Sequence, residues 1–457
     1  MTHTIAPDAA RRRAPLRSVV VSGVGNVLEW YEWTAYAVFA PFIAAAVFNA
    51  DDPVSSLLST LAVFAVGFLM RPLGGVFFGR LADRRGRKFV LIATMLMMAG
   101  GSLAIGLMPT YDSIGTWASV LLLALRLIQG FAHGGESATV AVYITEMSTP
   151  QRRGMWGSFT FVAVFGGAVI AYLTGATVTG ALDATAVSNW AWRIPFLLGG
   201  AFAVVVLILR RQMDESEVFE EHAAGVSSGT TTAPPVSRRQ LIRGILLCFA
   251  LMSGISAAHY TWLSYASTYA IVQKGMDANS AFWMSLIATV IATVAVPWFG
   301  LLSDKIGRRP MLITFGVGIV VLQFPLMTLI SDRPWTLLVA ATVGLMIVCA
   351  GSCVSAAMPE ILPTPIRAMA LGIGFSSASA IFGGSAPYVN QLLNSLDVPW
   401  AANFYIMSLA LLTAFTAWRL IPETKGIDLA AAGRDDTAAR QRGVAVVLAE
   451  NRAYMPG

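Results

Sequence analysis

Ionisable side chains interrupt the long apolar stretches of this sequence, mostly in its first half. A charged group at the centre of a membrane helix costs about 2.5 to 3.5 kcal/mol on insertion scales, so such residues mark candidate functional sites. The second half has one inside an apolar stretch, His259. The first half has six: Glu29, Glu32, Arg71, Arg126, His133 and Glu136. The two halves therefore differ in the chemistry that they offer.

The spacing of the polar residues predicts two helix faces that meet. Steps of three, four and three residues separate one set: Arg126, Gln129, His133 and Glu136. A second set shares a face earlier in the chain, with Glu32 beside it: Asn26, Glu29, Trp33 and Tyr36. These steps match the helical period, so each set lies on one side of its helix. We expect both faces to line a common aqueous cavity, where carboxylates neutralise Arg126.

Arg126 lies near the middle of its apolar stretch and is the predicted anchor of an anionic ligand. Its guanidinium is planar and can hold both oxygens of a carboxylate. Further binding residues are predicted nearby: Gln129, Tyr36, Asn26 and His259. Alternatives stay open: Arg126 and Glu136 could simply pair and hold helices together, and the aromatic neighbours of His259 could simply pack.

Four residues are predicted to carry protons: Glu32, Glu136, Glu29 and His133. A carboxyl group withdrawn from water can take up a proton and become neutral. Histidine titrates near neutral pH, which would suit a pH-sensitive gate. A neutral, hydrogen-bonded packing role is the alternative for His133.

The elements that carry these residues are long and apolar. Hydrophobic residues make up 56% of the 457, charged residues 12%, and the mean hydropathy is +0.67. Soluble domains typically carry about 25% charged residues, which excludes a soluble globular protein. A membrane span needs about 20 apolar residues, and twelve such stretches fit between Ser18 and Ile421. The runs are continuous and do not alternate, so we predict an all-α membrane protein and not a β-barrel.

Basic residues gather in every second loop, which predicts the orientation. The loops at residues 84–88, 152–153, 210–211 and 305–309 are basic, whereas the alternate loops are mainly acidic. By the positive-inside rule, both termini and the long middle loop lie in the cytoplasm. We expect a multi-pass protein of a bacterial cytoplasmic membrane, in contact with the lipid bilayer. The net charge of +6 then reflects topology and not nucleic acid.

An internal repeat divides the sequence into halves. Segment Gly79–Lys88 recurs as Gly300–Arg309, with both glycines and the aspartate Asp83 repeated 221 residues later. Parallel six-helix repeats imply a two-fold axis along the membrane normal and a binding site between the halves. The predicted parts are an N-terminal tail, a six-helix bundle, a flexible linker, a second six-helix bundle and a C-terminal tail, at residues 1–17, 18–212, 213–240, 241–421 and 422–457.

Several segments together resemble one family of membrane transporters. The glycine–aspartate–glycine–basic segment in both halves is similar to the signature of the major facilitator superfamily. Six more segments resemble its metabolite:proton symporter family: Gly25–Glu32, Arg71–Gly75, Arg126–Gly130, Gly134–Glu136, Trp192–Phe196 and Ile381–Gly384. The resemblance spans about residues 18–425 and implies twelve helices in two parallel six-helix repeats. Family members usually have aspartate where this sequence has Glu32.

The resemblance also implies a gate at the basic loops. Asp83 is expected to accept hydrogen bonds from the N-terminus of the eleventh span, near Arg367, and to latch the outward-open state. Gly79 and Gly86 would permit a close helix approach and a tight turn. The other residues assigned to this gate are Arg87, Glu146, Asp304, Arg308 and, unless it only pairs helices, Arg71.

These observations predict a proton-coupled symporter that imports a small organic anion, such as a mono- or dicarboxylate, by alternating access. Segment Ile381–Val389 is most similar to the 2-oxoglutarate permease branch. An importer of proline or betaine is the first alternative, ahead of a multidrug exporter and a non-transporting membrane enzyme or sensor. The sequence has no phosphate loop, zinc-spaced histidine pair or cysteine ligand set, so no enzyme activity, cofactor or metal is predicted. We expect the monomer to be functional.

Overall fold

A computed structural model describes most of the chain, and the described residues are helical apart from short connections. The described ranges are 16–49, 51–85, 87–134, 148–211, 237–363 and 366–427. Side chains are not described at residues 16–24, 82–84, 87–88, 209–211 and 368. Ten helices in these ranges are long and apolar enough to cross a membrane. With the α1–α2 segment and the shorter α7, they form the twelve spans that the sequence predicted.

The first half of the chain supplies six spans, two of which break into shorter helices. They are α1 (Leu16–Val38) with α2 (Ala40–Val47), α3 (Pro53–Leu69) with α4 (Arg71–Arg85), α5 (Arg87–Leu107), α7 (Trp117–His133), α9 (Arg153–Ala181), and η1 (Ala191–Arg193) with α11 (Ile194–Arg211). Short helices α6 (Tyr111–Ile114) and α10 (Ala184–Asn189) lie in the connections. The predicted fourth span reached residue 144, and its part beyond residue 134 lies outside the described ranges.

The second half supplies the other six spans. They are α13 (Arg238–Tyr260) with η2 (Thr261–Tyr265) and α14 (Ala266–Lys274), α15 (Ala278–Ile306), α16 (Arg308–Leu329), α17 (Pro334–Gly351) with α18 (Val354–Ile361), α19 (Arg367–Ala378) with η4 (Ser379–Gly383) and α20 (Ala386–Ser395), and α21 (Pro399–Arg419). Both η2 and η4 are π-helical turns. Helix α13 begins inside the segment 213–240 that was predicted as linker.

Local sequence explains the break and the start of the second span. Helix α3 ends at Leu69 and α4 begins at Arg71, next to Pro72. Proline has no N–H to donate and its ring clashes with the preceding turn, so the span breaks here. Asp52 caps α3 by accepting from the backbone N–H groups of Val54 and Ser55 at 3.1 and 3.0 Å. Hydrogen bonds from Ser55 lower the pKa of the Asp52 carboxyl.

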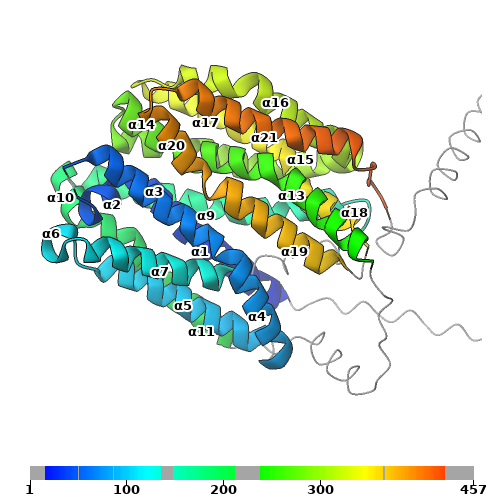
Figure 1. Cartoon of the computed structure of the whole chain (residues 1–457), viewed down its shortest axis with the longest axis horizontal. Coiled ribbons are helices and arrows are strands. Elements are labelled where there is room, and N and C mark those ends of the chain that lie inside the picture. The colour runs from blue at the N-terminus through cyan, green and yellow to red at the C-terminus, as the bar shows by residue number, and fades with distance from the viewer. Residues whose placement is uncertain are drawn as a thin grey trace, which may run out of the picture.

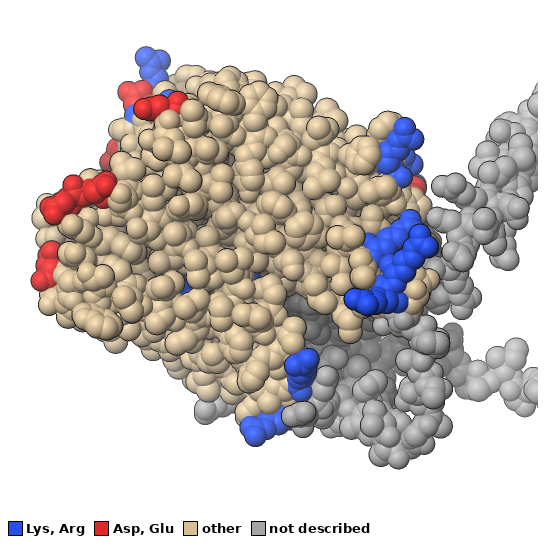
Figure 2. Space-filling model, in the orientation of Figure 1, with Lys and Arg blue, Asp and Glu red and all other residues tan. Residues whose placement is uncertain are grey.

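Charges separate along the long axis of the molecule, with basic side chains mainly at one end and acidic ones mainly at the other (Figure 2). We name these the basic end, which carries Arg85, Arg153, Arg238 and Arg308, and the acidic end, which carries Asp52, Asp112, Asp183, Asp277 and Asp397. Little charge lies between them on the face shown, as expected for a surface that contacts lipid.

The two halves meet along two lines (Figure 1). Along the first, α9 packs against α15: Gly154 faces Gly300 at the basic end, and Asn279 Nδ2 donates to the Ala176 carbonyl at 2.6 Å at the acidic end. Along the second, α3 and α4 lie against α19, η4 and α20. The halves therefore touch at both ends of the molecule.

Candidate functional site

A glycine-lined contact between the second and fourth spans positions the candidate site. A Cβ atom at Gly130 would lie 1.9 Å from the Gly67 carbonyl oxygen, and one at Gly134 would lie 2.0 Å from the Arg71 carbonyl oxygen. Both distances are far inside van der Waals contact, so the two backbones come this close only with glycine at these positions. The contact brings Arg71, on α4, near His133 at the end of α7.

Arg126 is held inside the first half of the chain. Its Nη1 donates to Gln129 Oε1 at 2.9 Å, and Gln129 Nε2 donates to Ser102 Oγ at 3.0 Å. The guanidinium lies 4.4 Å from the centre of the Trp33 ring and 4.0 Å from that of Tyr36. Its Nε and Nη2 are buried and have no hydrogen-bond partner among the described residues. Donors on both nitrogens are therefore available to an anionic ligand.

Arg71 is a second buried cation on the same aromatic cluster. Its guanidinium lies 3.5 Å from the centre of the Phe68 ring and 4.2 Å from that of Trp33. Its Nε and Nη2 also lack a hydrogen-bond partner within the described part of the chain. The sequence placed Arg71 near the basic end, as a gate or helix-pairing residue. In the structure it instead shares the ring of Trp33 with Arg126, because the break at Pro72 and the glycine contact turn it inward.

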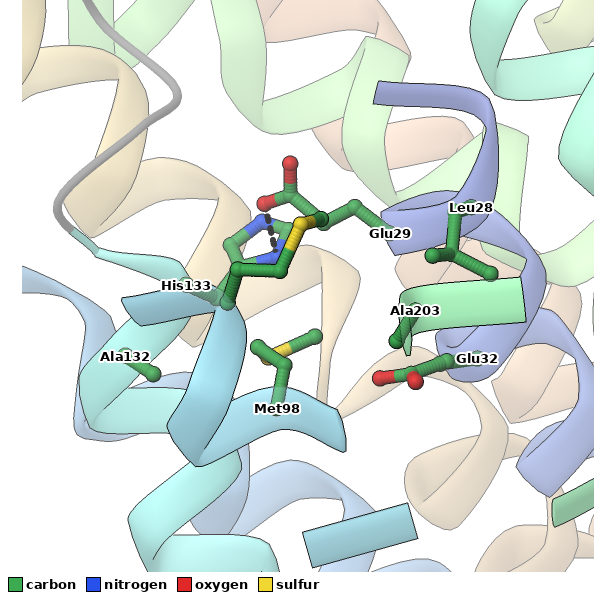
Figure 3. A pocket seen from close by; sticks show the side chains of 8 residues that line it. Leu28, Glu29, Glu32, Met98, Ala132, His133 and Ala203 are labelled. Carbon is green, nitrogen blue, oxygen red and sulfur yellow. Dashed lines mark ion pairs between the residues drawn. The ribbon is translucent and has the colours of Figure 1, made fainter. Parts of the chain in front are cut away.

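Glu29 and His133 form a close pair between α1 and α7, which Figure 3 marks with a dashed line. The indole Nε1–H of Trp33 donates to the same His133 nitrogen, Nδ1, at 3.1 Å. An imidazole nitrogen that accepts a hydrogen bond carries no proton of its own. Nδ1 has one lone pair, so it can accept from Trp33 or from a protonated Glu29 carboxyl group. Glu29, Trp33 and His133 therefore form one group that can gain or lose a proton.

Glu32 lines a small cavity of about 10 Å³, which is room for about one water. All residues around the cavity belong to the first half of the chain: Leu28, Glu29, Glu32, Met95, Met98, Ala132, His133 and Ala203. Figure 3 shows the Glu32 side chain next to Ala203, with its carboxyl group on the side of Met98. Neither oxygen has a hydrogen-bond partner among the described residues. A buried carboxyl in such surroundings is costly unless it carries a proton or gains a partner.

The second half of the chain meets this cluster through the end of α13. His259 stacks on Phe165, with ring centres 5.6 Å apart and planes at 13°. Trp30 lies between the halves, 5.9 Å from His133 and 6.3 Å from His259. Both ring nitrogens of His259 and the hydroxyl groups of Tyr260 and Ser256 are buried without a described hydrogen-bond partner. Polar groups of both halves therefore converge on one region.

This arrangement is suited to binding an anion between the halves. The first half offers guanidinium donors and carboxyl groups, and the second half offers an imidazole and hydroxyl groups. Buried arginines with free donors favour planar oxyanions such as carboxylates. Within the described ranges, no group of three or more His, Cys, Asp or Glu residues is placed to hold a metal ion.

A comparison with known protein families decides the identity of this fold. The profile of the Major Facilitator Superfamily matches residues 23–387 and 283–449. The chain belongs to the major facilitator superfamily. It is a membrane transporter, as are the relatives and solved structures that it matches.

The names of proteins related to this major facilitator mention different solutes. The chain is 35% identical over 422 residues to the alpha-ketoglutarate permease of Escherichia coli (strain K12), and the match covers 92% of this chain and 96% of that protein. It is 30% identical over 429 residues to the proline/betaine transporter of the same strain, covering 90% and 84%. A putative proline/betaine transporter of Staphylococcus aureus (strain COL) is 34% identical over 418 residues, covering 87% and 86%.

Solved structures share the fold of this major facilitator at low sequence identity. A D-xylose–proton symporter superposes with a TM-score of 0.72 at 18% identity, covering 90% of this chain and 99% of that one. A proton:xylose symporter bound to 6-bromo-6-deoxy-D-glucose gives 0.71 at 19% identity, covering 91% and 97%. At this identity the likeness concerns the fold, and the solute site must be argued from this chain's own residues.

At the basic end of this major facilitator, Asp304 joins the two halves. Its carboxylate oxygens accept from the backbone N–H groups of Gly154 and Met155, at 2.8 and 2.9 Å, in the first turn of α9. A carboxylate there satisfies free N–H groups and faces the positive end of the helix dipole. Arg308 Nη1 donates to Asp304 at 2.7 Å and Nη2 donates to Glu360 at 3.1 Å. Glu360 also pairs with Arg153 across the halves, at 3.3 Å.

The remaining predicted residues fall into three groups. Arg126, Gln129 and Tyr36 are in contact, while Asn26 lies half-buried on α1, one turn before Glu29. The described part of the chain leaves out Glu136, Glu146, Gly86 and the side chains of Asp83 and Arg87. Among the described residues, the close approach expected at Gly79 is not seen, because a Cβ atom there would meet none of them within 4 Å. Its repeat partner Gly300 does pack closely, with a Cβ position 2.7 Å from the Gly154 carbonyl oxygen.

Sequence reasoning missed three contributions to the site. Ser102 fixes Gln129, and Ser256 adds an unpartnered hydroxyl group, but neither residue is distinguished in the sequence from ordinary small residues of a span. Trp33 was placed on the polar face of the first span, and that position was the available signal for its contacts with both arginines.

Proposed function

We propose that this major facilitator is a proton-coupled symporter that imports a small organic anion, with one or two carboxylate groups, by alternating access. The observation that carries the proposal is the pair of buried arginines, Arg71 and Arg126, with unpartnered nitrogen atoms beside Trp33. A buried cation is costly without a compensating anion. The similarity to the alpha-ketoglutarate permease, whose named solute is a carboxylate, supports the same chemistry.

Proton coupling follows from the carboxyl groups around the arginines. Before the solute arrives, negative charge on Glu29 or Glu32 compensates the guanidinium groups. An arriving carboxylate takes over that role, and the carboxyl side chain is then free to hold a proton. The proposed proton-coupling residues are Glu32, Glu136, Glu29 and His133, and the proposed solute-binding residues are Arg126, Gln129, Tyr36, Asn26 and His259. Arg71 joins the latter group.

Import of proline or betaine is the second candidate, supported by the relatives that carry those names. A quaternary ammonium is recognised by open aromatic faces. In this chain, guanidinium groups already lie over Trp33 and Phe68, at 4.2 and 3.5 Å from the ring centres. Because these ring faces are already covered by guanidinium groups, the site favours an anion over a solute with a positively charged group of its own.

We also propose that the basic end faces the cytoplasm of a bacterial cell, together with both termini. The proposed organisation keeps the bundles at 18–212 and 241–421 and works as a monomer. Asp83, Gly86, Arg87, Glu146, Asp304 and Arg308 are the proposed gate. The hydrogen bonds of Asp304 to the start of α9 support its part in holding the basic end closed.

Transport by the purified protein in liposomes tests the proposal. With an inward proton gradient, we expect accumulation of a labelled mono- or dicarboxylate that a protonophore abolishes. An Arg71→Gln/Arg126→Gln double variant is the control, and it should show no uptake above empty liposomes. Accumulation of proline or betaine alone would favour the second candidate. Accumulation that persists with the protonophore would contradict proton coupling.

A further inference from the structure

A groove lies on the outer surface of the second half, between α13 and α21, and is separate from the solute site. Its volume is about 830 Å³, within the roughly 300–1,000 Å³ of pockets that hold a whole small molecule. Apolar side chains of both helices line it, among them Leu246, Phe249, Leu412 and Phe415. Its surroundings are exposed apolar residues of membrane-spanning helices, so lipid is the medium that reaches it.

The end of the groove nearest the basic end is strongly positive. Arg238, Arg239 and Arg243 line it, and all three are exposed. Among the described residues, no acidic side chain belongs to the lining and none forms an ion pair with the three arginines. Figure 2 shows basic side chains gathered at this end of the molecule. Three exposed guanidinium groups beside an apolar groove suit a ligand with an anionic head and an apolar body.

We propose that this groove binds an anionic glycerophospholipid from the leaflet at the basic end. Its phosphate lies at Arg238, Arg239 and Arg243, and one acyl chain follows the apolar residues of α13 and α21. Basic pockets between spans recognise lipid headgroups in this way. A free phosphate would leave the apolar length of the groove empty, whereas a lipid fills both parts.

Native mass spectrometry of the purified full-length protein tests this site. The protein in detergent is titrated with phosphatidylglycerol or with phosphatidylcholine of the same acyl chains. We expect selective retention of phosphatidylglycerol. Each arginine near an anionic headgroup is worth about a factor of five, so Arg238→Gln/Arg239→Gln/Arg243→Gln should weaken retention roughly 100-fold. Arg80→Gln/Arg85→Gln/Lys305→Gln removes the same charge from the same end, away from the groove, and should retain the lipid.

A second variant tests the apolar part of the site. Leu412→Trp fills the groove without changing its charge and should also weaken retention of phosphatidylglycerol. Three results would each overturn the proposal: equal retention of the two lipids, wild-type retention by the groove triple variant, or equal loss in both triple variants. Unchanged retention in Leu412→Trp would show that the acyl chain does not lie in the groove.

Discussion

The guanidinium groups of Arg71 and Arg126 both face the ring of Trp33, at 4.2 and 4.4 Å from its centre. The two guanidinium groups carry the same charge, and like charges placed on one ring repel each other in a medium of low dielectric constant. The aromatic ring offsets part of that cost through its electron-rich faces. The remainder is relieved when an anion arrives, so the pair gives the empty protein an affinity for negative charge. Trp33 also donates to His133, which links the arginines to the Glu29–His133 pair.

Removing either arginine is expected to weaken binding of the transported carboxylate. Hydrogen bonds to charged groups contribute about 1.5 to 3 kcal/mol, so Arg71→Gln and Arg126→Gln should each weaken affinity roughly 10- to 100-fold. Arg126→Lys keeps the charge but loses the planar fork, and should fall in between. Isothermal titration in detergent measures this, with the exposed Arg333→Gln as the control. Wild-type affinity in Arg71→Gln would leave Arg126 as the anchor and return Arg71 to a structural role.

Replacing Glu32, a proposed proton-coupling residue, should uncouple transport from the proton gradient without stopping transport. Glu32→Gln is nearly isosteric and cannot exchange a proton at neutral pH. We expect it to lose accumulation driven by a pH gradient while it keeps exchange of solute for solute. Asp332→Asn, at an exposed position, is the control. If Glu32→Gln still concentrates solute and Glu29→Gln does not, the coupling proton belongs to the Glu29–His133 pair.

Asp304→Asn is expected to loosen the basic end. Asparagine loses the charge that faces the dipole of α9 and the ion pair with Arg308. Ser355, which accepts a hydrogen bond from Thr160 across the halves, is changed to cysteine after Cys248, Cys349 and Cys353 are replaced by alanine. Maleimide should label this cysteine faster in the Asp304→Asn protein.

Asp277→Asn provides the matched control for this experiment. Asp304 lies near the C-terminal end of α15, and Asp277 caps the N-terminal end of that helix by accepting from Ser280 N–H at 2.9 Å. Asparagine is an equally good cap, so labelling at Ser355→Cys should not change. Equal labelling of the wild-type and Asp304→Asn proteins would show that Asp304 does not hold the basic end closed.

The glycine contact between the second and fourth spans should be intolerant of a methyl group. Gly130→Ala places Cβ 1.9 Å from the Gly67 carbonyl oxygen, so the backbones must separate. Forced overpacking costs about 1 to 3 kcal/mol or more, and Tm should fall by several degrees. Gly79→Ala is the control, because its Cβ meets open space and alanine favours a helix by about 1 kcal/mol. Equal melting temperatures would contradict the role given to Gly130.

Much of this protein could be predicted from its sequence because a membrane restricts what a span can contain. The twelve spans and the buried face of Arg126, Gln129 and His133 follow from apolar length and helical period. The place of Arg71 could not be predicted, since it depends on a break at Pro72 and on how closely two backbones approach. The repeat made Gly79 and Gly300 equivalent, whereas, within the described ranges, Gly300 packs against the opposite half and a Cβ atom at Gly79 meets nothing within 4 Å.

The small cavity beside Glu32 has a consequence for the membrane as a whole. Protons cross an apolar layer readily when a continuous file of hydrogen-bonded waters connects its two sides. A cavity of about 10 Å³ holds about one water and cannot contain such a file. In this conformation, a proton at Glu32 therefore has no aqueous route through this cavity. Under the proposed proton coupling, a cavity this small keeps a continuous file of water from passing Glu32 in this conformation.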